Sequence, residues 1–113
     1  MLAWGGIAPV HWYEYVAAFV AGAAFANVVP HFVHGVSGDP FPTPFAKPPG
    51  RGLSSPTVNV VWALANLLLG YVLLLHSGVS LQPSLALLCF FAGIAFLGIQ
   101  LSVGFRKKHK QPD

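Results

Sequence analysis

The residues of this chain that could carry chemistry are polar side chains set within long apolar runs. Asn27, His31 and His34 lie near the end of the first run, and Glu14 lies near its start. His31 and His34 are three residues apart, so on a helix they lie near one face. Either could offer an axial ligand to a tetrapyrrole, chlorophyll or haem. A metal site is not predicted, because a third ligand would have to come from Asp39 or the C-terminal tail.

Structural roles compete with these interpretations. Asn27 and His31 are four residues apart and could bond each other or the carbonyl groups that Pro30 leaves free. Glu14 falls in the first helical turn, where water, headgroups and the helix N-terminus favour a negative charge, and His11 could pair with it. Ion or proton handling by Glu14 and Asn27 is the alternative interpretation.

The composition predicts a membrane protein. Hydrophobic residues make up 55% of the 113 residues and charged residues only 8%, whereas soluble domains are roughly one quarter charged. The net charge of +3 rests mainly on the tail after residue 105, which directly follows an apolar run. We therefore predict contact of this tail with lipid headgroups and no binding of nucleic acid. The sequence has no phosphate-binding glycine loop, catalytic triad or carboxylate pair, so an enzyme is not predicted.

Three apolar segments, each long enough to span roughly 30 Å of hydrocarbon, predict an all-α integral membrane protein with a single domain. The short turn between the last two segments predicts that they are antiparallel neighbours. In chain order the predicted parts of residues 1–113 are a crossing over about 11–34, a connector over 35–55, crossings over about 56–76 and 83–105, and a basic tail over 106–113.

The connector contains five prolines and four glycines, so neither helix nor strand is predicted there. Phe41 and Phe45 suggest a loop that lies on the membrane face or against a neighbouring protein, and a flexible linker is the alternative. Ser55 followed by Pro56 predicts the start of the second helix. Pro30 should bend the first helix about one turn before its end.

Small and amide residues recur at helical spacing and predict faces for helix contact. We expect these faces to exceed what three helices use among themselves, which predicts association with other integral membrane subunits. The predicted packing residues are Ala18, Gly22 and Ala26 in the first segment, Asn59, Ala63, Asn66 and Gly70 in the second, and Gly93 in the third.

The basic residues also predict an orientation. All six Lys and Arg residues lie in the connector and the tail, which three crossings place on the same side of the membrane. By the positive-inside rule this side is cytoplasmic and the N-terminus is outside.

Three stretches carry a resemblance to a group of proteins. They are Asn27-x-x-Pro30-His31-Phe32-x-x-Gly35, then Phe41-Pro42-Thr43-Pro44-Phe45-Ala46, and then Ser55-Pro56-x-x-Asn59-Val60. Together they resemble a group of small bacterial membrane proteins of uncharacterised function. The resemblance implies a bacterial inner (cytoplasmic) membrane setting and carries no activity with it.

The favoured prediction is a non-catalytic accessory or structural subunit of a larger membrane complex, with the connector as a cytoplasmic docking loop. The first alternative is a tetrapyrrole-binding subunit of a photosynthetic or respiratory complex, ligated through His31. The second is a small oligomeric transporter in which Glu14, Asn27 and His31 line a path, since three crossings cannot enclose a pore alone.

Overall fold

The structure, a computed structural model, describes residues 11–80 and 82–106, and in these it contains three long helices and one short strand pair. The helices are α1 (Trp12–Val36), α2 (Pro56–Leu75) and α3 (Leu85–Gly104), and each is long and apolar enough to cross a membrane. The prediction of a mostly helical chain with three such helices is confirmed. α1 continues through Pro30 without a break. Most of the predicted basic tail lies outside the described residues.

Serine side chains fix the starts of the second and third helices. The hydroxyl oxygen of Ser55 accepts a hydrogen bond from the Val58 N–H at 3.1 Å, and Pro56 occupies the first helical position. Ser84 accepts in the same way from the Leu87 N–H at 3.1 Å. Both serines therefore satisfy an N–H group that the helix itself leaves without a partner.

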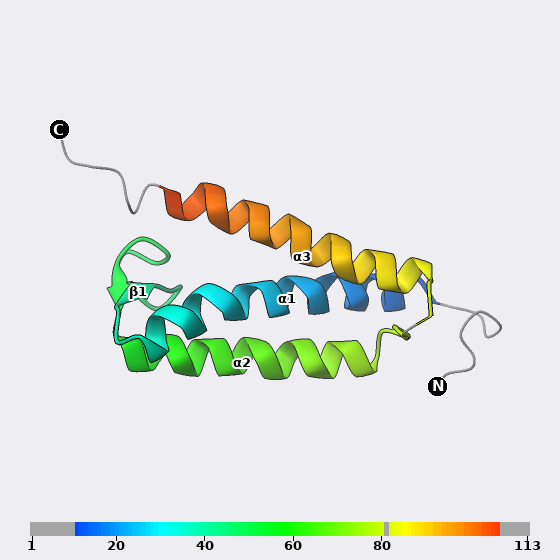
Figure 1. Cartoon of the computed structure of the whole chain (residues 1–113), viewed down its shortest axis with the longest axis horizontal. Coiled ribbons are helices and arrows are strands. Elements are labelled where there is room, and N and C mark those ends of the chain that lie inside the picture. Colours follow the sequence, from blue (N-terminus) through cyan, green and yellow to red (C-terminus); the bar gives the residue numbers. More distant parts are fainter. Residues whose placement is uncertain (1–10, 81, 107–113) are drawn as a thin grey trace.

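α1 forms the centre of the bundle, with α2 packed along one side and α3 along another (Figure 1). α2 and α3 make hardly any contact with each other. The predicted antiparallel direction of the second and third crossings holds (Figure 1), but the prediction that they are neighbours is wrong. The turn between them is short, but it passes the start of α1, where Glu14 lies against Gly78.

The central position of α1 follows from its two contact faces. Toward α2, Gly35 leaves room for Val60, and the ring of Phe25 lies over Gly70. A side chain at either glycine would overlap these neighbours, so the two helices depend on glycine for their close approach.

The second face of α1 receives α3 through a pair of glycines. A Cβ atom at Gly22 would overlap the carbonyl oxygen of Phe90, and one at Gly93 would overlap the carbonyl oxygen of Phe19. Each helix backbone thus lies directly on a glycine of the other. Toward the connector end α3 diverges from α1 (Figure 1).

The connector folds into a cap on one end of the bundle, and we call residues 37–55 the connector cap. Its strands β1 (Phe41–Pro42) and β2 (Leu53–Ser54) pair antiparallel, with Phe41 opposite Ser54. The prediction that the connector contains no strand is therefore wrong. Proline can lie in such a ladder when its missing N–H falls at an edge, and here the ladder is only two residues long.

Buried Thr43 holds the turn between the two strands together. Its carbonyl accepts hydrogen bonds from the N–H groups of Ala46 at 3.1 Å and Gly50 at 2.8 Å. Its hydroxyl lies 2.5 Å from the Ser54 hydroxyl and accepts from the Phe45 N–H at 3.1 Å. The hydroxyl and the backbone carbonyl of Thr43 thus make hydrogen bonds in a loop where the prolines have no N–H to donate.

Candidate functional site

The most highly connected polar side chain in the described residues is Asn59, at the junction of α1, α2 and the connector cap. It is fully buried, and its amide nitrogen lies 3.0 Å from the carbonyl oxygens of Phe41 and Ser55 and 3.2 Å from that of Ser54. Its amide oxygen lies 2.7 Å from Nδ1 of His31. Because the amide nitrogen faces carbonyl groups, the oxygen must be the acceptor toward His31. His31 Nδ1 therefore carries a proton and donates it to this bond.

Aromatic rings enclose His31. Phe41 packs edge-to-face against it with ring centroids 5.4 Å apart, and the rings of Trp62 and Phe105 lie at 6.4 Å. The histidine is only 2% exposed. An axial ligand needs a free ring nitrogen, and with Nδ1 bonded to Asn59 that nitrogen is Nε2. In this structure the surrounding side chains cover the ring, so a cofactor would need them to move before it could reach His31.

His34 lies in a different environment from His31. Its ring stacks on Phe41 with centroids 4.2 Å apart, and its Nδ1 lies 3.7 Å from the carboxylate of Asp39. Phe41 thus lies against both histidines. Across residues 11–80 and 82–106, no three His, Cys, Asp or Glu side chains are grouped to hold a metal. Of the two histidines, only His34 borders the groove between α1 and α3.

A second amide pair joins α1 and α2 deeper in the bundle. Asn27 donates to the side-chain oxygen of Asn66 at 3.2 Å, and Asn66 in turn donates to the carbonyl oxygen of Trp62 at 2.9 Å. The structure places the predicted packing residues of the second crossing on this contact, since they are the buried residues of α2. These residues are Asn59, Ala63, Asn66 and Gly70.

The predicted small residues of the other two crossings also lie inside the chain. Ala18, Gly22 and Gly93 are buried, the two glycines between α1 and α3. Ala26 is half-buried and borders the groove described below. These positions therefore serve contacts within one chain.

Glu14 lies at the opposite end of the bundle from His31, about 25 Å away along α1 at 1.5 Å per residue. Its carboxylate lies 3.5 Å from Nδ1 of His11 and rests against Gly78. Asn27 is engaged by Asn66, and His31 by Asn59. The three residues predicted to line a transport path are thus each held in a separate contact.

Trp62 belongs to this junction, although its sequence position did not reveal it. Its indole nitrogen is buried and has no hydrogen-bond partner among the described residues. Its ring packs edge-to-face against Phe45 of the connector cap with centroids 5.0 Å apart. An aromatic residue near the end of an apolar segment is equally typical of an interfacial anchor, which is why the sequence could not assign it here.

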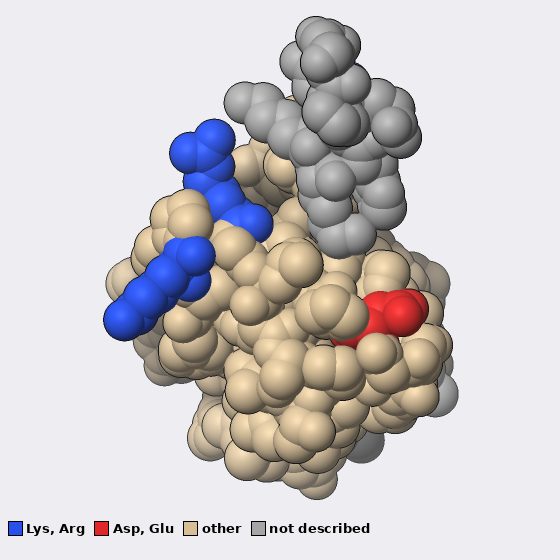
Figure 2. Space-filling view, turned by 90° about the vertical axis from the view of Figure 1, so that its left-hand side faces the viewer, with Lys and Arg blue, Asp and Glu red and all other residues tan. Residues whose placement is uncertain are grey.

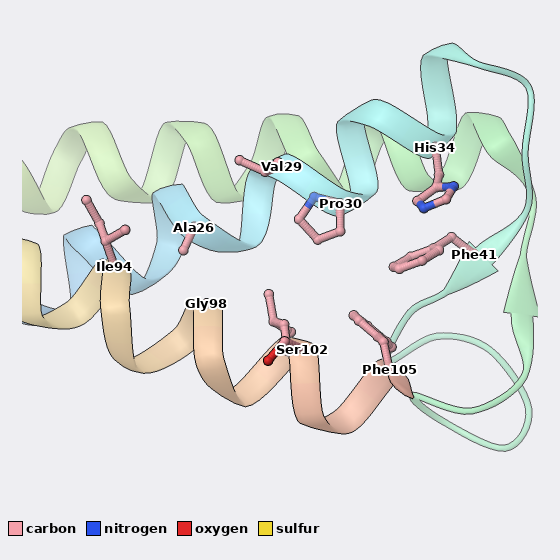
Figure 3. Close-up of a pocket in the computed structure, with 10 residues that line it drawn as sticks. Ala26, Val29, Pro30, His34, Phe41, Ile94, Gly98, Ser102 and Phe105 are labelled. Carbon is pink, nitrogen blue, oxygen red and sulfur yellow. The ribbon is translucent and has the colours of Figure 1, made fainter. Parts of the chain in front are cut away.

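A groove of about 460 Å³ opens between α1 and α3 where the two helices diverge (Figure 3). Its walls are apolar apart from His34 and Ser102, and Phe41 and Phe105 meet at its connector end with ring centroids 4.6 Å apart. The sequence spacing of Gly98 and Ser102 could have indicated this groove, because small residues four positions apart leave a hollow on the surface of a helix. The residues that line it are Ala26, Val29, Pro30, His34 and Phe41 with Ile94, Gly98, Leu101, Ser102 and Phe105.

The positive charge of the described residues lies at the connector end of the bundle. Lys47, Arg51 and Arg106 are all exposed there, and they are the Lys and Arg residues that the structure describes. Figure 2 shows Lys and Arg side chains on one side of this end, apart from an acidic side chain. The Lys residues predicted to contact headgroups beyond residue 106 lie outside the described part of the chain.

Comparison with protein-family models, with curated proteins and with solved structures finds no match to this chain. The resemblance of its three proline-containing stretches to small bacterial membrane proteins stays a prediction.

Proposed function

We propose that this chain is an integral protein of a bacterial inner membrane and a non-catalytic accessory subunit of a larger membrane complex. Its three apolar helices support a membrane location. The gathering of Lys47, Arg51 and Arg106 at one end supports a cytoplasmic connector cap and C-terminus, with the N-terminus outside.

The observation that carries the proposal is the use of the intramembrane polar groups. Asn27 and Asn66 bond each other, and Asn59 joins His31 to the connector cap. Polar side chains inside a membrane often have a function, because placing them in hydrocarbon costs free energy. In this chain their described contacts hold α1, α2 and the cap in place, which supports a structural role over a catalytic one.

The outer surface of the connector cap supports docking of a partner. Phe45 and Leu53 are 63% and 59% exposed, and Lys47 and Arg51 are exposed on the same loop. Phe and Arg are enriched in protein interfaces relative to the rest of the surface. The small residues that predicted association, such as Ala18 and Gly22, are used inside the chain, so the cap takes over their expected role.

The test is extraction of the full chain from its own membranes in mild detergent, followed by native mass measurement. We expect co-purification with larger membrane subunits at a fixed stoichiometry. Replacing both Phe45 and Leu53 by Ala should weaken that assembly, while replacing Leu68 and Val72, exposed on α2, by Ala should leave it intact. A chain that runs alone or only with its own copies would refute the accessory role.

The absorption spectrum of the same preparation tests the tetrapyrrole alternative. A pigment band lost in His31→Ala would favour the predicted ligation through His31. A band lost in His34→Ala and kept in His31→Ala would favour cofactor binding at the groove. A colourless complex at fixed stoichiometry would favour the structural role proposed here.

A further inference from the structure

The groove between α1 and α3 differs from the other helix contacts of the bundle in being open and apolar. Around Gly22 and Gly93 the two helices touch backbone to backbone, whereas near Gly98 they have separated. A Cβ atom at Gly98 would meet nothing within 4 Å. In a helix that crosses a membrane, such a hollow faces hydrocarbon, and some apolar group must fill it.

The size of the groove favours a narrow occupant. A helix about 10 Å in diameter fills roughly 420 Å³ in each turn of 5.4 Å. The groove holds about 460 Å³ along the stretch of α3 from Ile94 to Phe105, which is about 16 Å long at 1.5 Å per residue. Its mean cross-section is therefore about 30 Å², whereas a helix about 10 Å across needs about 80 Å². The groove is too narrow to seat a partner helix, whereas one acyl chain is slender enough to lie along Ala26 and Gly98.

The charge at the mouth of the groove selects the headgroup. Arg106 directly follows Phe105, which lines the groove, and it is exposed. Lys47 and Arg51 belong to the connector cap at the same end of the bundle, and Figure 2 shows Lys and Arg side chains on this end. The acidic group near the groove, Asp39, is paired with His34 at 3.7 Å. Basic pockets between membrane helices on the cytoplasmic side are typical sites for anionic lipid headgroups.

We propose that this groove binds one anionic phospholipid, with an acyl chain between α1 and α3 and its phosphate near Arg106. The groove supplies the apolar seat and the basic end supplies the charge preference. The proposal rests on the membrane location proposed above and not on a partner subunit, so it is tested with the purified chain alone.

The chain offers a matched pair of variants for the test. Gly98 lines the groove and Gly104 does not, yet a Cβ atom at either glycine would meet nothing within 4 Å. Both lie on α3, Gly98 in its interior and Gly104 as its last residue, and neither has a positive φ, so the backbone accepts Leu at both positions. Only Gly98→Leu places a side chain in the groove.

The experiment is native mass spectrometry of the full chain in detergent, with phosphatidylglycerol or phosphatidylcholine of identical acyl chains. We expect one phosphatidylglycerol retained per chain by the unaltered protein and by Gly104→Leu, and its loss in Gly98→Leu. Arg106→Gln should reduce the preference for phosphatidylglycerol over phosphatidylcholine about fivefold, the effect of one basic group near an anionic headgroup.

Three results would overturn the proposal. Equal retention by Gly98→Leu and Gly104→Leu would show that lipid binds elsewhere on the chain. Equal retention of the two lipids by the unaltered protein would remove the headgroup preference. A lipid-free dimer that Gly98→Leu dissociates would assign the groove to a second copy of the chain. None of these results depends on whether a partner subunit exists.

Discussion

Replacing Asn59 by Ala should release the connector cap from the bundle. Asn59 is fully buried and contacts His31 and the carbonyl oxygens of three cap residues at 2.7 to 3.2 Å. Alanine keeps the helix and removes every one of these hydrogen bonds. The cap then loses the hydrogen bonds that the Asn59 side chain of α2 donates to its carbonyl groups.

The free energy that the closed cap loses follows from the polar groups that lose their hydrogen-bond partner. His31 Nδ1–H and at least one buried carbonyl would be left unsatisfied, and each such group costs about 1–3 kcal/mol. Hydrogen bonds between membrane helices average only about 0.6 kcal/mol, so the lower end of that range applies near the bilayer surface. We expect the closed cap to lose at least about 2 kcal/mol, which is roughly a 30-fold rise in the population of its open form.

Limited trypsin digestion of the purified chain in detergent measures this opening at Arg51, inside the cap. When opening is fast, the cleavage rate follows the open population. Cleavage after the exposed Arg106 provides an internal standard, and Asn66→Ala provides the matched control on the same face of α2. We expect Asn59→Ala to be cut after Arg51 about 30 times faster, and Asn66→Ala to be cut at the original rate. Equal rates for the two variants would refute the assignment of Asn59 as the link.

Two further predictions concern the helix crossing and the orientation of the chain. Gly93→Leu should lower the melting temperature in detergent, because its side chain would overlap the Phe19 carbonyl and overpacking costs about 1–3 kcal/mol. Gly98→Leu places its side chain in open space and should leave the melting temperature unchanged. An equal fall in melting temperature for both variants would contradict the described crossing of α1 and α3. The orientation can be tested in a chain whose native Cys89 is replaced, with a single cysteine introduced at Gln82 or at Pro49. An impermeant maleimide applied to intact cells should label the cysteine at position 82 and not the one at position 49. The reverse labelling pattern would contradict the proposed topology.

The sequence predicted the helices because their signals are local. Segment length and apolar content set the three crossings, and Ser55 followed by Pro56 marked the start of α2, where the hydroxyl accepts the Val58 N–H. The regular spacing of Asn59, Asn66 and Gly70 placed them on one face, since a helix repeats every 3.6 residues. Such properties depend only on residues a few positions apart.

The arrangement of those helices depended on contacts far apart in the sequence. A short turn predicted that the second and third crossings are neighbours, but α1 lies between them. It approaches α2 closely at Gly35 and Gly70, and α3 closely at Gly22 and Gly93. Nor could periodicity show that Asn59 bonds His31 and Phe41, since these partners lie 28 and 18 residues away in the sequence. The composition of the connector predicted no regular structure, whereas buried Thr43 and the β1–β2 pair fold it.

Local sequence thus determined where this chain is apolar, where its helices begin and which of their faces can be approached closely. Tertiary structure alone decided which partner each face receives, because a small-residue face fits another helix of the same chain as well as a foreign one. It also produced the groove, which exists only because α1 and α3 touch at Gly22 and Gly93 and then diverge.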